Sequence, residues 1–298
     1  MRSMRVPRLL PAAEHLARFA LNRAGIRSTY CEAEGVRVHA YSGRGSGALP
    51  PTVLVHGLGA AGSAFTRLAG GVRPHVRRVI VPELPGHGFS AHPGRRVTPD
   101  LLLDCMTSAL DALVDEPAIL YGNSLGGAVA LEYAIRRPER VRGLVLVSPA
   151  GARLQADEWK ELVAAFDVQS ARDARRFLDR VYHRPPWVLA LVAHEFPDLL
   201  RKPAVREILD SATPDGSASP DALAALKMPI LLLWGRSEKL LPASALAYFR
   251  EHLPPHAIIE EPHGFGHSPQ LEVPERVGAR VVAFAREVVG RAEGERAP

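Results

Sequence analysis

Short apolar runs alternate with helical patterns along the first half of the chain. The runs are rich in β-branched residues and end at glycine, proline or polar residues, which predicts buried strands. They comprise residues 36–41, 52–55, 78–81, 118–121 and 141–147. Because buried strands that alternate with helices form parallel sheets covered on both faces, the pattern predicts an α/β fold.

Helical sequence interrupts this alternation over residues 150–226, where no strand-like run occurs. Strand patterns resume at residues 230–234 and 257–260. Residues 30–149 and 227–298 are therefore predicted to form a mostly parallel sheet with helices on both faces, and residues 150–226 an inserted helical cap. The insertion point places this cap over the carboxyl-end edge of the sheet, where α/β folds carry their sites.

Residues 1–29 form an amphipathic segment ahead of the predicted core. Its apolar residues lie at helical spacing, and they are Leu9, Leu10, Ala13, Leu16, Ala17, Ala20 and Leu21. Arginines surround them, which leaves two interpretations: an extra helix packed on the domain, or a helix that contacts the cap or a membrane surface. A basic amphipathic pattern occurs in both kinds of helix, so it does not decide between these interpretations. Packing on the domain requires fewer assumptions.

Composition excludes several classes of protein. Hydrophobic residues make up 47% of the 298 residues and charged residues 23%, so the chain has enough apolar material for a core. Cys31 and Cys105 are the only cysteines, which excludes a disulfide scaffold. Pro7, Pro11 and Glu14 interrupt the basic N-terminus before a secretory apolar region can form. No apolar run reaches the ~18 residues of a transmembrane segment, so we expect a cytoplasmic protein.

The net charge of +5 does not indicate a nucleic-acid partner. Arginine carries nearly all of the positive charge, but the arginines are scattered, acids lie among them and no aromatic residues are interleaved. Nucleic-acid sites concentrate their basic residues on one face. Solvated surfaces account for this distribution, and no nucleic-acid partner is expected.

A candidate nucleophile lies in the segment Gly122-Asn-Ser124-Leu-Gly126, between a predicted strand and a predicted helix. A G-x-S-x-G pattern is short enough to occur by chance, but a nucleophile elbow requires this position. The glycines remove Cβ atoms that would clash in a tight strand-to-helix turn. Ser124 then projects at a helix N-terminus, whose N–H groups suit a developing oxyanion. A glycine-rich turn capped by serine is the alternative.

A serine hydroxyl needs a base, and the base needs an acid that orients it. Of the twelve histidines, His267 is the best candidate because it lies in the loop between the last strand and the last helix. His263, close by, is its competitor. Glu238 follows the carboxyl end of the preceding strand, and Asp157 is the alternative acid. Parallel strands would bring Ser124, Glu238 and His267 to the same edge of the sheet.

An oxyanion hole needs two N–H donors. One is expected from Leu125, the residue after the nucleophile. The other is expected from Leu58, in the segment His56-Gly-Leu-Gly59 that follows the strand at residues 52–55. Gly57 and Gly59 would let the backbone approach a substrate closely.

With these residues placed, the chain resembles the α/β-hydrolase superfamily with a helical cap. The resemblance rests on His56-Gly-Leu-Gly59, Pro85-Gly-His-Gly-Phe-Ser90, Gly122-Asn-Ser-Leu-Gly-Gly127, Trp234-Gly-Arg-Ser-Glu238 and Gly266-His267 with Pro269-Gln-Leu-Glu272. It implies hydrolysis through an acyl-serine, with no metal or organic cofactor. Two positions depart from the family, because Glu238 and Glu83 stand where aspartate is usual.

The leading hypothesis is a serine hydrolase of the carboxylesterase or lipase type, which cleaves a small to medium apolar ester. The elbow is also similar to that of the meta-cleavage-product hydrolases, which split carbon–carbon bonds. Those enzymes commonly have a tryptophan after the catalytic histidine, where this chain has Ser268. A cofactor-free perhydrolase or acyltransferase stays open because both use the same triad. A ligand receptor stays open as well, because a fold does not imply a function.

The predicted cap is expected to cover the site. Its large apolar residues are Trp159, Phe166, Phe177, Val181, Trp187, Leu191 and Phe196. We expect more than half of them to pack within the cap and the rest to line a mostly apolar pocket. Five cap arginines on a helical segment are expected on a solvated face, and they are Arg172, Arg175, Arg176, Arg180 and Arg184.

Overall fold

The computed structural model describes residues 9–216 and 218–294. Its centre is an eight-stranded sheet of order β1-β2-β4-β3-β5-β6-β7-β8. Strand β2 pairs antiparallel with β1 and with β4, and every other pairing is parallel. The predicted mostly parallel sheet is therefore confirmed. The strands are β1 (Arg27–Ala33), β2 (Val36–Arg44), β3 (Thr52–Val55), β4 (Arg78–Pro82), β5 (Ala118–Asn123), β6 (Val141–Val147), β7 (Ile230–Leu233) and β8 (Ile258–Glu260).

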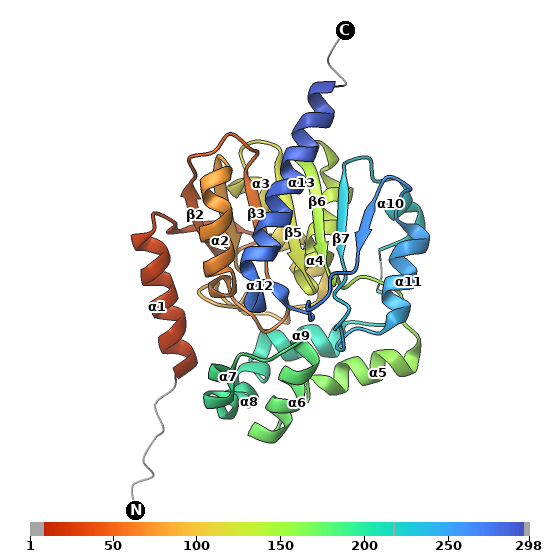
Figure 1. Ribbon diagram of the computed structural model, residues 1–298. Coiled ribbons are helices and arrows are strands. Elements are labelled where there is room, and N and C mark those ends of the chain that lie inside the picture. The colour runs from red at the N-terminus through yellow and green to blue at the C-terminus, as the bar shows by residue number, and fades with distance from the viewer. Residues whose placement is uncertain (1–8, 217, 295–298) are drawn as a thin grey trace, which may run out of the picture.

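Helices cover both faces of the sheet, as Figure 1 shows. Successive side chains of a strand point to opposite faces, so Leu120 and Tyr121 of β5 enter different hydrophobic clusters. The Leu120 cluster includes residues of α3 (Pro99–Leu113), α4 (Leu125–Arg136) and α11 (Ala243–His252). The Tyr121 cluster includes residues of α2 (Thr66–Val72) and α13 (Pro274–Gly294). These two clusters form the core that fixes the strand ends.

The helical insertion occupies the chain between β6 and β7, and Figure 1 shows its helices gathered beyond one end of the sheet. They are α5 (Ala156–Ala165), α6 (Ala171–Val181), α7 (Trp187–Leu191), the 3-10 turn η4 (Ala193–Glu195), α8 (Phe196–Leu200), α9 (Pro203–Ser211) and α10 (Pro220–Ala224). The candidate nucleophile, acid and base follow β5, β7 and β8, and these strands end at the side of the sheet where the insertion lies.

The N-terminal segment is helical over α1 (Leu9–Arg23), and β1 already begins at Arg27. The boundary expected at residue 29 thus falls within a strand. Strand β1 escaped prediction because it is an edge strand of mixed polarity, in which only Ala33 is buried. Helix α1 packs on the domain through the buried Leu21, and Leu10 packs against the core of the insertion. None of the helices in the described ranges is long and apolar enough to cross a membrane.

Candidate active site

A strained serine joins β5 to α4. Ser124 has φ 55° and ψ −122°, and a positive φ of this kind costs a non-glycine residue of order 1–3 kcal/mol. A Cβ atom at Gly122 would lie 2.2 Å from the carbonyl oxygen of Gly126, and one at Gly126 would lie 2.2 Å from that of Val55. Close backbone packing of β3, β5 and α4 therefore holds the turn, with Ser124 on the wall of a cavity.

The loop after β3 runs directly past Ser124. A Cβ atom at Gly57 would lie 3.0 Å from the Cβ atom of Ser124. Leu58, the next residue in that loop, and Leu125, the first residue of α4, line the same cavity as Ser124. Both residues expected to supply oxyanion N–H groups thus lie at the cavity that the nucleophile candidate faces.

Glu238 and His267 form a buried pair, with 2.8 Å between Glu238 Oε2 and His267 Nδ1. Glu238 Oε1 accepts hydrogen bonds from the N–H groups of Leu240 at 2.7 Å and Leu241 at 3.0 Å. Burial alone raises the pKa of Glu238, but attraction to His267 and the hydrogen bonds from His267 and Leu241 outweigh it and hold the pKa below its usual value. Because an ionised Glu238 accepts a hydrogen bond, His267 Nδ1 must donate, and in the neutral imidazole the lone pair that a base needs is then on Nε2.

Asn123 connects the elbow to the loop that carries His267. Its Nδ2 group donates to the carbonyl oxygen of His267 at 2.8 Å. Its Oδ1 atom accepts from Gln270 Nε2 at 2.8 Å and from Ser268 Oγ at 3.2 Å. The residue before Ser124 thus binds the backbone of the base candidate directly, which brings the end of β5 against the loop after β8.

The sequence pattern gave no role to Asn123 or Gln270, although both lie in segments that carry the family resemblance. Tyr121 extends their network, since its buried hydroxyl donates to Gln270 Oε1 at 3.0 Å. Buried polar groups that are fully hydrogen-bonded make a site rigid. The signal that could have found them is a polar Asn123 at the end of an otherwise apolar strand.

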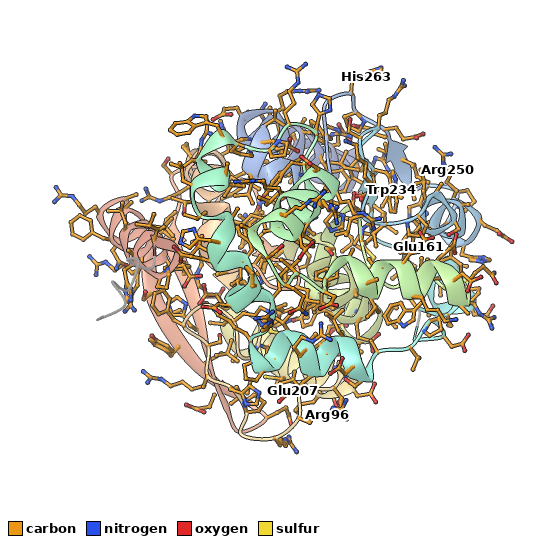
Figure 2. All side chains as sticks on the ribbon, turned by 90° about the horizontal axis from the view of Figure 1, so that it is seen from below. Arg96, Glu161, Glu207, Trp234, Arg250 and His263 are labelled. Carbon is orange, nitrogen blue, oxygen red and sulfur yellow. The ribbon has the colours of Figure 1, made fainter. Side chains whose placement is uncertain are left out.

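The alternative base and acid lie elsewhere. His263 is exposed, and Figure 2 shows it at the periphery of the molecule. Asp157, in the first turn of α5, has a side chain 94% exposed and an ion pair of 3.7 Å with Lys160. Neither residue has the buried partner that Glu238 and His267 give each other.

Two buried histidines near the cavity have structural partners. His56 Nε2 accepts a hydrogen bond from the N–H of Leu84 at 3.1 Å, which ties the loop after β3 to the loop after β4. Burial lowers the pKa of His56, and it lowers the pKa of His87 to about 3. Both rings are therefore neutral at pH 7.

The cavity beside Ser124 has a volume of about 460 Å³ and a mostly apolar wall, a size typical of small-molecule sites. Among the described residues that line it, Asp100 is the one charged residue, and it is exposed. None of the described lining residues is a lysine, arginine or histidine. The large apolar side chains in the wall are Leu58, Leu102, Leu103, Leu125, Leu154, Trp159, Leu162, Phe166, Ile208, Leu209, Leu240 and Leu241.

The aromatic residues of the insertion divide into three groups. Trp159 and Phe166 line the cavity. Phe177 and Phe196 pack in the insertion's own cluster, as expected for most of them, and Phe166 also belongs to it. Trp187 is 79% exposed and serves neither purpose, so the expected inward position is wrong for this residue. The expected solvated face is confirmed, since Arg172, Arg175, Arg176, Arg180 and Arg184 are all exposed.

Comparisons with known proteins identify the family and the fold of the chain. The family model for the alpha/beta hydrolase fold matches residues 50–274. The chain is similar to a 2-hydroxymuconate semialdehyde hydrolase of Pseudomonas sp. (strain CF600), with 34% identity over 70% of this chain and 77% of that protein. It is also similar to a pimeloyl-[acyl-carrier protein] methyl ester esterase of Yersinia enterocolitica, with 28% identity over 79% of this chain and 93% of that protein.

Among solved structures, the chain is similar to a membrane phospholipase A described as a bacterial virulence factor. The TM-score is 0.78 at 25% identity, and the match covers 94% of this chain and 91% of that one. These relatives carry out different hydrolytic reactions on one architecture. The family match and the relative at 34% identity show that the chain belongs to the α/β-hydrolase fold family.

Proposed function

We propose that the chain is a serine hydrolase that cleaves carboxylic esters with an uncharged, apolar acyl group. The observation that carries the proposal is the strained Ser124 on the wall of an apolar cavity, held by Asn123 against the loop of the buried His267–Glu238 pair. The esterase among the relatives supports this class of reaction. The insertion acts in the proposal as a cap whose Trp159 limits the pocket.

In the proposed reaction, Ser124 Oγ attacks the ester carbonyl carbon while His267 Nε2 takes the hydroxyl proton. The N–H groups of Leu58 and Leu125 stabilise the oxyanion, and Glu238 stabilises the imidazolium. The C–O bond then breaks, and His267 gives its proton to the leaving alcohol while the acyl group stays on Ser124. Water that loses a proton to His267 then attacks the carbonyl carbon of the acyl-serine, the C–O bond to Ser124 breaks, and His267 returns the proton to Ser124 Oγ as the acid leaves.

The charge of the cavity favours an ester over the carbon–carbon alternative. The relative from Pseudomonas is named for a muconate, which is a carboxylate. A carboxylate that enters an apolar cavity loses its hydration, and it needs a cation or hydrogen bonds in return. The described lining offers no cationic side chain, and Asp100 adds a negative charge. Neutral substrates therefore fit this site better than anionic ones.

Perhydrolases and acyltransferases share the first half of this reaction, with peroxide or a second alcohol in place of water. Product analysis in the presence of each acceptor separates them from a hydrolase. A ligand receptor is separated by a fluorophosphonate probe, which labels an activated serine. Labelling that disappears in Ser124→Ala supports an enzyme, and a folded chain that the probe does not label contradicts the proposal.

The test of the substrate class is a series of p-nitrophenyl esters from acetyl upward, with a carboxylated ester of matched length and a ring-fission diketone for comparison. Each buried methylene contributes about 0.8 kcal/mol, or roughly fourfold in affinity. We expect kcat/KM to rise from acetyl to a short or medium acyl chain and then to fall. A preference for acetyl, for the carboxylated ester or for the diketone would contradict the proposal.

A further inference from the structure

Exposed apolar side chains are concentrated on two elements. Eight large apolar residues are exposed in the described ranges, and six of them lie on α1 and α7. Single exposed apolar residues are normal on a protein surface, but a concentration of them marks an interaction site. We call these six the exposed apolar surface, which consists of Leu9, Leu16, Phe19, Trp187, Val188 and Leu191.

Helix α1 has apolar residues on both of its faces. The inner face includes Leu21, which is buried, and Leu10, which packs on the insertion. Leu9, Leu16 and Phe19 lie seven and three positions apart, so they share the opposite face of the helix. They are 45%, 68% and 57% exposed. Packing on the domain explains the apolar residues on the inner face of α1. It does not explain those on the outer face, which are not buried against other described elements.

The two elements are held together by one buried carboxylate. Glu195 accepts hydrogen bonds from the N–H groups of Leu9 at 2.6 Å and Leu10 at 2.9 Å, at the start of α1. Glu195 belongs to η4, which follows α7 closely in the chain, and it is only 7% exposed. Figure 1 shows the start of α1 at the side of the molecule that carries α7 and α8. The start of α1, with Leu9, therefore lies at the same end of the molecule as α7, and the rest of α1, with Leu16 and Phe19, extends from that end along the side of the molecule.

Positive charge adjoins these residues. The Arg23 guanidinium lies 5.7 Å from the centre of the Phe19 ring, on the outer face of α1. Arg184 is exposed and lies three residues before Trp187. The chain ahead of α1, residues 1–8, contains three arginines and no acidic residue. Helices that lie at the surface of an anionic membrane typically expose tryptophan, phenylalanine and leucine side chains and carry arginines beside them. The exposed apolar surface has this composition.

We propose that α1 and α7 together bind the surface of an anionic lipid bilayer. The exposed apolar surface enters the boundary between headgroups and acyl chains, and the arginines contact the anionic headgroups. A second copy of the chain fits the same surface less well. A symmetric contact would bring Arg23 and Arg184 of both copies to the same interface, where like charges repel. The proposal is independent of the proposed esterase activity.

The experiment is flotation of the full chain with vesicles of phosphatidylglycerol and phosphatidylcholine, compared with vesicles of phosphatidylcholine alone. We expect clear binding to the anionic vesicles and weaker binding to the neutral ones. The double variants Trp187→Ser/Leu191→Ser and Leu16→Ser/Phe19→Ser should each lower the partition coefficient at least about tenfold. Tyr30→Ser is the matched control, since Tyr30 is exposed on β1 outside this surface, and it should leave binding unchanged.

A triple variant separates the charge from the apolar contacts. Arg2→Gln/Arg5→Gln/Arg8→Gln should weaken binding to anionic vesicles by about fivefold per arginine, with little effect on neutral vesicles. Circular dichroism shows that each variant is folded. Failure of the folded chain to bind either vesicle would overturn the proposal, as would binding that neither double variant changes. Light scattering without lipid tests for a second copy, and a dimer that the double variants dissociate would assign the surface to self-association.

Discussion

The sheet core and the helical insertion meet at the cavity, but they contribute to it differently. The candidate acid and base, Glu238 and His267, follow strands of the core and are buried and hydrogen-bonded to each other, with side chains 2% and 4% exposed. Helix α5 supplies Trp159 to the cavity wall although none of its own residues is buried. The contrast teaches that strand ends fix the positions of the proposed reacting groups, while an outer helix shapes the cavity that we propose for the substrate.

One segment of the insertion departs from this division. The carbonyl oxygen of Val181 accepts a hydrogen bond from the N–H of His267 at 2.8 Å. Two residues later, His183 Nδ1 hydrogen-bonds with Ser237 Oγ at 2.7 Å, next to the acid candidate. We call residues 181–184 the strap, because this segment touches the loops of both the acid and the base. The strap gives the insertion a direct contact with the proposed chemistry.

The largest expected effect tests the core side of the comparison. Ser124→Ala should lower turnover by a factor of order 10³–10⁶, because it removes the nucleophile and leaves binding in place. Alanine fits the turn, so circular dichroism should be unchanged. The measurement is ester hydrolysis by the purified variant. Retention of most of the activity would show that the reacting serine lies outside the elbow.

The acid comes next in magnitude. Glu238→Gln should lower kcat by about 10²–10⁴, because the imidazolium loses its charge partner while Ser124 and His267 remain. Asp157→Asn is the matched control, since its carboxylate lies on the exposed surface of α5, and it should retain normal turnover. A normal rate for Glu238→Gln together with a loss in Asp157→Asn would move the acid from the core to the insertion.

The choice of base can be decided in the same assay. His267→Ala should be nearly inactive, because no other group then accepts the serine proton. His263→Ala should keep much of the activity, since His263 is exposed at the periphery of the molecule (Figure 2). The reverse pattern would exchange the two assignments.

A variant that disturbs the strap should have a smaller effect, and it tests whether this segment of the insertion influences the proposed base. Glu272 accepts hydrogen bonds from the N–H of Arg184 at 2.8 Å and from that of Gly266 at 3.2 Å, so it joins the strap to the loop of the base. In Glu272→Gln one of the two carboxylate oxygens becomes an N–H₂ group. That group would face the backbone N–H of Arg184 or of Gly266, and two donors cannot form a hydrogen bond. We expect kcat to fall about tenfold, equivalent to about 1.4 kcal/mol, with KM little changed and the pH profile displaced.

Glu275→Gln is the control for that variant. Glu275 is 72% exposed, and it pairs with Arg67 across the surface, three residues from Glu272. Surface ion pairs contribute little to stability, so this variant should resemble the wild type. If Glu272→Gln also leaves kcat and the pH profile unchanged, the strap serves only to hold the insertion.

The local pattern of apolar residues predicted the strands and helices whose side chains are buried in a continuous run. It missed the features that depend on residues far apart in the sequence. Strand β6 was expected at residues 141–147 and has those bounds, because its apolar run is continuous. Helix α2 was missed because it is short and contains Gly70 and Gly71. The motif located Ser124, whereas the bonds of Asn123 to Gln270 and His267 join residues more than 140 positions apart. No local spacing encodes such pairs.

Helical spacing also could not tell which face of a short helix turns inward. Charged residues flank Trp159 in the sequence, whereas Trp187 opens an apolar run, so local sequence alone favours burial of Trp187 over Trp159. In the structure Trp159 lines the cavity and Trp187 is 79% exposed. Which apolar residues become buried is decided by tertiary packing, and a helix of five residues such as α7 has too few turns to show a periodic face.

This pair supplies the last and smallest prediction. Trp159→Ala should lengthen the acyl pocket, so the preferred ester should become longer by one or more methylenes and kcat/KM for short esters should fall by roughly fourfold per lost methylene contact. Trp187→Ala should leave the chain-length profile unchanged, because its side chain does not reach the cavity. The measurement is the p-nitrophenyl ester series with both variants and the wild type. If Trp187→Ala changes the chain-length profile and Trp159→Ala does not, the substrate binds outside the cavity beside Ser124. The insertion would then contribute to substrate binding through α7 and not through α5.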